Sequence, residues 1–320
     1  MLLFFIMNVF LTGGTGFIGS YVVMELIKYG HNVTLLARDC DKIPAFTRIN
    51  GLEIREGDIS DKELLAELIK GKDACILIAL NYTKQTAWEV LMDDTLPTVY
   101  MSDIAARAGV RHFIYTSSTA VNDSLYMGGE QPEEPVKTVD TATKQHPATF
   151  YGATKAASEN FLIAQSYRSA MRINIIRPGY TFGNPVMEGA PTQADTRFHT
   201  FIKDALAGKP LFVIKNDGTQ FIWAGDLARL YMEILHSNVN RKTYFGLSHK
   251  FIPWHAVARE AVKKCGSQSV IHLEDKGWSD DGVYWDVSGM QRDFGLEFDS
   301  WEKICGHLDY YIELEEGLLA

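Results

Sequence analysis

Short apolar runs alternate with helical patterns over the first half of the chain. Six strands are expected, at Asn8–Thr12, Val33–Ala37, Leu52–Glu56, Ala74–Ala79, His112–Thr116 and Asn174–Arg177. Most of these runs are aliphatic or β-branched with little polar interruption, which is typical of parallel strands that are buried on both faces. Their alternation with helices predicts βαβ units and a parallel sheet.

Helical patterns fill the stretches between these strands. One extends over Phe17–Tyr29 and ends at Gly30, a residue type common just past a helix end. Ser60–Glu63 has the sequence of a capping box that opens a second helix. A long helical stretch precedes Gly109, and another extends over about Tyr151–Ser169.

The pattern becomes less regular after Arg177-Pro178-Gly179, where Gly, Pro, Asn and Thr are frequent. Further helices are expected at Arg197–Ala207, Asp226–His236, Trp254–Lys264 and Trp301–Glu315, with short strands near Leu211–Ile214 and Thr243–Phe245. Asp226 is expected to be a helix N-cap. We therefore expect an α/β protein with a Rossmann doubly wound parallel sheet over residues 1–178. A smaller carboxyl-terminal α/β lobe is expected over residues 179–320, with some elements of residues 225–250 returning to the sheet.

Composition narrows the class of protein. The 320 residues are 46% hydrophobic and 22% charged, the balance of a globular protein in water. The formal net charge of −9, without a run of Lys or Arg, argues against nucleic acid as a partner. No apolar run is long enough to span a bilayer, so no membrane partner is expected. The four cysteines are isolated, which predicts reduced thiols in a cytoplasmic protein and no metal site.

A glycine-rich loop follows the first predicted strand and opens the first predicted helix. Gly13 permits a tight turn, Gly16 lets a pyrophosphate approach the backbone, and Gly19 lets the helix pack close to the sheet. The helix N-terminus then offers N–H groups and a partial positive charge to phosphates. The sequence therefore predicts a dinucleotide site, with loop contacts from Gly13, Thr15, Gly16, Phe17, Ile18 and Gly19.

The end of the second predicted strand bears on the choice of cofactor. NAD binders place an acid at this position to accept hydrogen bonds from the ribose. Ala37 stands there instead, and the following Arg38 suits a 2′-phosphate. Arg38 therefore makes NADP(H) the preferred cofactor. NAD(H) is the alternative, because Asp39 offers a ribose contact. Asp58 is either an adenine contact or a turn residue.

A tyrosine and a lysine at helical spacing form the candidate catalytic pair. Of 14 tyrosines, Tyr151 alone has a lysine, Lys155, four residues later. This spacing puts both side chains on one helix face, where the ammonium lowers the pKa of the phenol from its usual value of about 10. Ser118 follows the fifth predicted strand and is preferred over Ser117 as donor to a substrate oxygen. Carboxyl ends of parallel strands are where ligands bind in such sheets.

These motifs resemble those of the extended short-chain dehydrogenase/reductases, also called the NAD-dependent epimerase/dehydratase family. The resemblance covers about Asn8 to Gly295 and rests on the glycine loop together with Gly57-Asp58, Ala79-Leu80, Tyr115-Thr116-Ser117-Ser118, Tyr151-Gly152-Ala153-Thr154-Lys155, Arg177-Pro178-Gly179 and Gly225-Asp226-Leu227-Ala228.

The resemblance implies roles for particular residues. Tyr151 would be the proton donor and acceptor, Lys155 would also bind the nicotinamide ribose, and Ser118 would orient the substrate oxygen. Further cofactor contacts would come from Asp58, Ile59, Ala79 and Pro178. A homodimer is also implied, through the helix before the fifth strand and the tyrosine helix.

Departures from the family pattern narrow the reaction. Asp94 stands where relatives have Asn, which leaves its role open. Ser118-Thr119-Ala120 replaces the Thr-Asp-Glu triplet of nucleotide-sugar dehydratases, which argues against dehydration. Sugar-nucleotide members of the family carry an arginine that binds the diphosphate, and this arginine is missing before Phe221. Arg197 or Lys215 is the candidate to replace it.

Three hypotheses follow for a small-molecule substrate. The first is an NAD(P)-dependent oxidoreductase that transfers hydride reversibly at a carbonyl or secondary alcohol. The alternatives are a nucleotide-sugar epimerase with retained NAD and a non-catalytic dinucleotide-binding protein.

Overall fold

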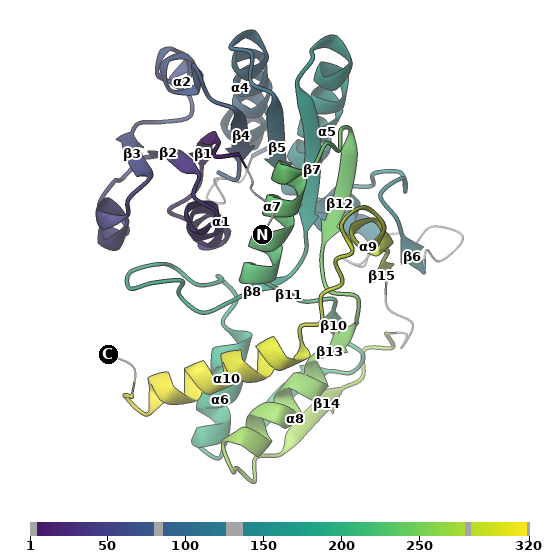
Figure 1. Cartoon of the computed structure of the whole chain (residues 1–320). Helices are drawn as coiled ribbons and strands as arrows, with labels where there is room; N and C mark the ends of the chain where they lie inside the picture. Colours follow the sequence, from purple (N-terminus) through teal and green to yellow (C-terminus); the bar gives the residue numbers. More distant parts are fainter. Residues whose placement is uncertain (1–4, 80–85, 126–136, 279–282, 319–320) are drawn as a thin grey trace.

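The computed structural model describes residues 5–79, 86–125, 137–278 and 283–318. Its centre is a seven-stranded sheet in the order β12-β7-β5-β4-β1-β2-β3, with every neighbouring pair parallel (Figure 1). The sequence-based prediction of a doubly wound Rossmann sheet is confirmed. The strands are β1 (Asn8–Thr12), β2 (Asn32–Ala37), β3 (Leu52–Glu56), β4 (Ala74–Leu77), β5 (His112–Thr116), β7 (Arg172–Pro178) and β12 (Lys242–Gly246).

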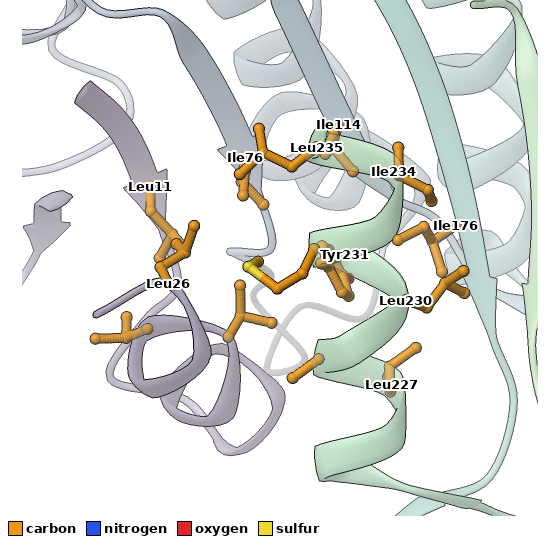
Figure 2. Packing of buried hydrophobic residues seen from close by; sticks show 14 of the residues in the cluster. Leu11, Leu26, Ile76, Ile114, Ile176, Leu227, Leu230, Tyr231, Ile234 and Leu235 are labelled. Carbon is orange, nitrogen blue, oxygen red and sulfur yellow. The ribbon is translucent and has the colours of Figure 1, made fainter. Parts of the chain in front are cut away.

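Helices cover both faces of the sheet. α1 (Phe17–Lys28) and α7 (Ala224–His236) pack on one face, and α2 (Lys62–Ile69), α4 (Leu96–Arg107) and α5 (Phe150–Arg168) pack on the other (Figure 1). Alternating strand residues supply the two cores, since Val9 and Leu11 join the α1/α7 side while Phe10 joins the other. Figure 2 shows α7 packing its leucines and Tyr231 against Ile76, Ile114 and Ile176 of the central strands.

The helix before β5 changes its hydrogen-bonding pattern part of the way along. α3 (Ala87–Val90) continues through a π-helical turn, η2 (Leu91–Thr95), into α4. The amide of Leu96 donates to the carbonyl of Leu91, five residues earlier. Pro97 follows and brings no N–H, so the turn before it lacks an ordinary α-helical donor.

A second group of elements lies below the sheet in Figure 1 and packs around an aromatic core. Phe182, Phe198, Phe221 and Trp254 are buried at its centre with edge-to-face or tilted ring contacts. This lobe contains β8 (Thr181–Phe182), α6 (Arg197–Leu206), β9 (Leu211–Ile214), β10 (Gly218–Thr219), β11 (Ile222–Trp223), β13 (Ile252–Pro253), α8 (Trp254–Lys264), β14 (Ile271–Glu274) and α10 (Trp301–Glu315).

The remaining short elements lie on the connections. They are η1 (Pro44–Arg48), η3 (Thr119–Leu125), β6 (Thr138–Val139), β15 (Tyr284–Trp285) and α9 (Ser288–Phe294). The expected strand near Thr243–Phe245 is β12 of the main sheet, and α7 packs on that sheet as well. The domain boundary at residue 178 stays a prediction.

Two predicted helix caps are wrong. The N-cap of α2 is Asp61, whose carboxylate accepts from the amide of Leu64 at 2.9 Å, so the Ser60 capping box does not form. α7 begins earlier than expected, with Trp223 at its N-cap. Asp226 therefore lies in the first turn, where burial raises the pKa of its carboxyl. Both helices thus begin one to three residues away from the start that the sequence predicted.

Buried histidines tie distant segments together in single tautomers. Gln193 Nε2 donates to His307 Nε2 at 2.8 Å, so His307 carries its proton on Nδ1 and donates to Asn184 Oδ1 at 2.6 Å. Tyr21 of α1 donates to the carbonyl of Asn184 at 2.6 Å. This chain of hydrogen bonds joins α10 in the lobe to the helix that follows the glycine loop.

A pair of histidines joins the residue before β2 to the end of α7. Met7 N donates to His31 Nδ1, so His31 Nε2 carries a proton and lies 2.8 Å from His236 Nε2. Both rings must be neutral in this arrangement. Burial, with His31 as the second cause, lowers the pKa of His236 to about 4.

Within residues 5–79, 86–125, 137–278 and 283–318, every helix is too short or too polar to cross a membrane.

Acid should destabilise the fold already at pH values well above those at which carboxylates titrate. Burial lowers the pKa of His307 to about 3 and, with Arg172 as a second cause, that of His112 to about 3, against 6.5 when unfolded. The unfolded chain therefore binds more protons below about pH 6.5, and the free energy of unfolding falls as pH falls. We expect His307→Gln to reduce the slope between pH 6 and 5 by up to about 1.4 kcal/mol per pH unit.

Denaturant unfolding at pH 7, 6 and 5 measures this slope. His272→Gln is the matched control, since His272 is exposed and stacks on Phe212 at the surface. If the H307Q slope equals that of H272Q, His307 does not carry the acid sensitivity.

Candidate active site

The glycine loop lies at the carboxyl end of β1, against the segment that follows β4. Gly13 has a φ of +79°, and a Cβ there would lie 2.5 Å from the amide nitrogen of Ala79. A side chain at Gly19 would collide with the carbonyl oxygen of Gly13, so Gly19 packs against the loop itself and not against the sheet as expected. Gly14 makes the close approach to the sheet, where a Cβ would lie 2.6 Å from Leu35 Cδ1. Gly14 was not among the glycines to which the motif assigned a role.

The N-terminus of α1 suits an anion. Its N-cap is Gly16, no side chain caps the first turn, and no acid stands in that turn. Backbone N–H groups at such a terminus bind phosphate. Because the loop is also bare of side chains at Gly13 and Gly16, these residues fit the pyrophosphate of a dinucleotide. The predicted contacts of Thr15, Phe17 and Ile18, which are partly buried around this turn, stay predictions.

The expected adenosine end lies over the ends of β2 and β3. Ala37 is buried and Arg38 is exposed beside it. Asp39 accepts from the amide of Asp41 at 2.9 Å, and Asp58 accepts from the amide of Ser60 at 2.9 Å, so both carboxylates order turns. Hydrogen bonds from Ser60, and more weakly the nearby Arg38, lower the pKa of Asp58.

Two further predicted cofactor residues are fixed through their backbones. The carbonyl of Ile59 accepts from the Tyr100 hydroxyl, and the amide of Ala79 donates to Thr12 Oγ1 at 3.4 Å. Pro178 is the buried last residue of β7. All three lie at or beyond the carboxyl ends of strands, on the same edge of the sheet as the glycine loop.

Tyr151 lies in the first turn of α5, held close to the segment after β5. The N-cap Thr149 accepts from the amide of Gly152 at 3.0 Å and donates to the buried carboxylate of Asp123. A Cβ at Gly152 would collide with the carbonyl of Ala120. Glycine beside the tyrosine therefore lets the start of the helix touch the loop that carries Ser118.

Lys155 places a buried ammonium one turn further along α5. Its side chain is 2% exposed, and its Nζ lies 3.3 Å from Asp94 Oδ1 and 3.2 Å from the carbonyl of Thr116. The same nitrogen lies 4.9 Å from the ring centroid of Tyr115 and 5.9 Å from that of Tyr151. The predicted proximity of Tyr151 and Lys155 is thus present, and the lysine is anchored to the end of β5.

The two serines after β5 have different surroundings. Ser117 is buried and its hydroxyl donates to Glu159. Ser118 is partly exposed, and its oxygen accepts from the amide of Ala120 at 3.1 Å. With that lone pair engaged, the Ser118 proton is oriented away from the Ala120 amide, which supports the preference for Ser118.

Glu159 and Arg177 form a buried ion pair that was not predicted from the sequence. Glu159 accepts from Arg177 Nε at 2.9 Å, from Arg177 Nη2 at 2.6 Å, and from Gln145 Nε2 at 2.6 Å. Because Glu159 also accepts from Ser117, it ties α5 to the ends of β5 and β7, next to Ser118 and Pro178. Its spacing in the sequence indicates its position, because Glu159 comes four residues after Lys155, which itself comes four residues after Tyr151.

Both cations suggested as diphosphate ligands already pair with carboxylates. Arg197 donates to Asp195 at 2.8 Å, lies 3.5 Å from Asp217, and stacks on Trp254 at 4.0 Å from the ring centroid. Lys215 is half-exposed and pairs with Asp275 at 2.8 Å. Around Arg197, two carboxylates face one guanidinium, which disfavours a dianionic group there.

In the part of the chain that the structure describes, no three His, Cys, Asp or Glu side chains cluster closely enough to hold a metal ion.

The chain is similar to known proteins in both sequence and structure. The family model described as the NAD dependent epimerase/dehydratase family matches residues 9–245. A sterol-4-alpha-carboxylate 3-dehydrogenase (decarboxylating) of Dictyostelium discoideum is 27% identical, over 84% of this chain and 71% of that protein. A UDP-glucose 4-epimerase of Yersinia pestis is 24% identical, over 87% of this chain and 89% of that protein.

Among solved structures, the Bordetella bronchiseptica enzyme WbmG, in complex with NAD, superposes with a TM-score of 0.78. It is 19% identical, and the match covers 96% of this chain and 94% of that one. At this identity the likeness supports the fold alone.

Proposed function

This chain belongs to the NAD-dependent epimerase/dehydratase family, and from that membership we propose that it is a dehydrogenase or reductase. It transfers hydride reversibly between a nicotinamide dinucleotide and a carbonyl or secondary alcohol, with Tyr151 as the acid and base. The observation that carries the proposal is the buried Lys155 ammonium, 5.9 Å from the Tyr151 ring and bonded to the end of β5.

The protein's own groups handle the proton. In the reducing direction Tyr151 donates its phenolic proton to the substrate oxygen, and in the oxidising direction it takes that proton back. The positive charge of Lys155 stabilises the phenolate left behind. Ser118 donates a hydrogen bond to the same oxygen and so holds the reacting carbon in place. The bound cofactor supplies or accepts the hydride.

The remaining predicted contacts belong to cofactor binding. Gly13, Thr15, Gly16, Phe17, Ile18 and Gly19 would hold the pyrophosphate, Asp58 and Ile59 the adenine side, and Ala79, Lys155 and Pro178 the nicotinamide side. The bare backbone of the glycine loop and the uncapped start of α1 support this assignment.

A dehydrogenase or reductase is favoured over a nucleotide-sugar epimerase by the surroundings of Arg197. Its guanidinium is engaged by Asp195 and Asp217, so a diphosphate would have to displace two carboxylates. A non-catalytic role is disfavoured because Tyr151 and Lys155 are both present and in contact range.

Replacing the phenol should abolish proton transfer and leave the helix intact. We expect Tyr151→Phe to lower kcat/KM about 10²–10⁴-fold, the usual loss when a general acid is removed. Absorbance of the reduced nicotinamide measures turnover, with 3-hydroxysteroids, simple ketones and UDP-glucose as test substrates.

Tyr167→Phe is the matched control, because Tyr167 is exposed on the same helix and its ring packs under Arg241. Full turnover by the Tyr151→Phe protein on a substrate that the wild type uses would remove Tyr151 from the mechanism.

NADP(H) is the proposed cofactor, with NAD(H) as the alternative. Support comes from the exposed Arg38 beside the buried Ala37, and from Asp39 being engaged in its own turn. A guanidinium at this place can bind a 2′-phosphate with charge-assisted hydrogen bonds.

Arg38→Ala should therefore weaken NADPH binding roughly 10–100-fold and leave NADH binding unchanged, since such bonds contribute about 1.5–3 kcal/mol. Quenching of protein fluorescence on titration with each cofactor gives both affinities. Arg48→Ala, an exposed arginine in η1, is the control. Equal affinity for NADH and NADPH in the wild type would contradict the assignment.

A homodimer is proposed through α4 and α5, which pack side by side (Figure 1). Large apolar side chains are exposed along these helices and the turns before α4, at Trp88, Leu91, Met92, Leu96, Phe150, Phe161 and Tyr167. Exposed apolar surface of this kind marks protein interfaces. Phe161→Glu should give a monomer in sedimentation velocity runs, whereas Phe212→Glu, at an exposed position on β9, should not.

A cytoplasmic location is also proposed, supported by four cysteines that are all free thiols. Fractionation of cells that express the protein checks it.

A further inference from the structure

We propose that Asp94 sets the pH range in which Tyr151 exchanges its proton, by placing a buried negative charge against the Lys155 ammonium. The inference rests on the proposed role of Tyr151. Asp94 acts on the phenol through the lysine, as a positioning residue.

The π turn η2 brings Asp94 into the interior beside α5. The Asp94 side chain is 6% exposed, and its two oxygens have separate partners. Oδ1 lies 3.3 Å from Lys155 Nζ, and Oδ2 accepts from Thr154 Oγ1 at 3.1 Å. Thr95, the next residue of the same turn, donates to the carbonyl of Thr154 at 3.2 Å. The turn is therefore fastened to α5 at consecutive residues.

The charged and titratable groups around the pair can be named element by element. β5 contributes the Tyr115 ring under Lys155, and burial raises the pKa of that phenol. α5 contributes Tyr151 and, one turn beyond Lys155, Glu159, whose charge is matched by Arg177 of β7. η3 contributes the buried carboxylate of Asp123, which accepts from the amide of Ala148 and the hydroxyl of Thr149 at the start of α5. α3 contributes Glu89, which accepts from Thr86, and η2 itself contributes the partly exposed Asp93. Close to Lys155, Asp94 is thus the carboxylate in direct contact.

The sign of the effect follows from the charges. A lone ammonium in a poorly polarisable interior would strongly favour the Tyr151 phenolate. A carboxylate 3.3 Å from that ammonium leaves the phenol facing a dipole with a much weaker field. Tyr151 therefore keeps its proton to a higher pH than it would beside a neutral amide. This keeps the acid form available near neutrality, as carbonyl reduction requires.

Asp94→Asn removes the charge with little change of shape. The amide oxygen still accepts from Lys155. Thr154 Oγ1 loses the carboxylate but also lies 2.9 Å from the carbonyl of Tyr151, which can take its proton. One N–H of the new amide can donate to Thr154 Oγ1, at the place where the carboxylate accepted from it. The donors of Lys155 and Thr154 therefore both keep an acceptor.

The experiment reads the phenol directly and needs no substrate. Ultraviolet absorbance of phenolate is titrated in four proteins, namely the wild type, Y151F, D94N and D94N/Y151F. Subtracting each Tyr151→Phe curve isolates Tyr151 in the two backgrounds. We expect its deprotonation midpoint to fall by about one pH unit or more when Asp94 becomes Asn. A midpoint that stays in place or rises would overturn the inference.

Two controls separate charge from other effects. Asp103→Asn removes an exposed carboxylate from α4 and should leave the midpoint unchanged. Thr154→Val removes the hydrogen bond to Asp94 but keeps the charge, so a shift as large as that of D94N would contradict the charge argument. Near-ultraviolet circular dichroism verifies folding, and Asp94→Ser is a second charge-removing variant. Loss of the proposed function would appear separately, as a Y151F protein that still turns over.

Discussion

Seven parallel strands impose the geometry of the site. Because all the strands run in the same direction, each connection returns from the carboxyl end of one strand to the amino end of the next. All carboxyl ends therefore lie along one side of the sheet. The glycine loop after β1, Ala79 after β4, Ser118 after β5 and Pro178 of β7 come from segments far apart in the chain, yet this single constraint collects them. The direction in which successive strands are added to the sheet reverses between β1 and β4. The connections after these two strands therefore lead to opposite faces of the sheet and leave a crevice for a ligand between them.

Charge compensation then fixes the helix that carries the chemistry. Residues at spacings of four along α5 present a phenol, an ammonium and a carboxylate to the sheet, and burial of the two charges is tolerated because each has a partner. Asp94 matches Lys155, and Arg177 matches Glu159. The ion pairs attach α5 to the neighbouring helix and to the strand ends, so the start of the helix is held where Tyr151 meets the Ser118 loop.

Patterns in the sequence predicted the sheet and its helices well, because long apolar runs and helical spacing report burial directly. They predicted the glycine loop and the contact of Tyr151 with Lys155 for the same reason, since the spacing is local. They failed at the start of α7, which lies three residues earlier than predicted, and at Gly19, which packs on Gly13 of its own loop. Spacing along α5 marks Glu159 as a residue on the Tyr151 face, but its pairing with Arg177 of β7 is a contact between two elements that only the folded chain shows. Arg197 was named, but its neutralisation by two aspartates appears only in the folded chain.

The π turn Leu91–Thr95 changes which side chains face the interior in the helical segments before and after it. Each residue of an α-helix advances by about 100°, so the wider turn works as an inserted residue that rotates everything before it relative to everything after. Asp94 is 6% exposed, whereas Trp88 on the preceding turn is 68% exposed. Excising a single residue here would straighten the helix and turn its first part by about a quarter of a revolution. Asp94 and the exposed apolar side chains before α4 would then both change position. An insertion or deletion in this segment would therefore alter both the proposed proton chemistry and the proposed dimer surface.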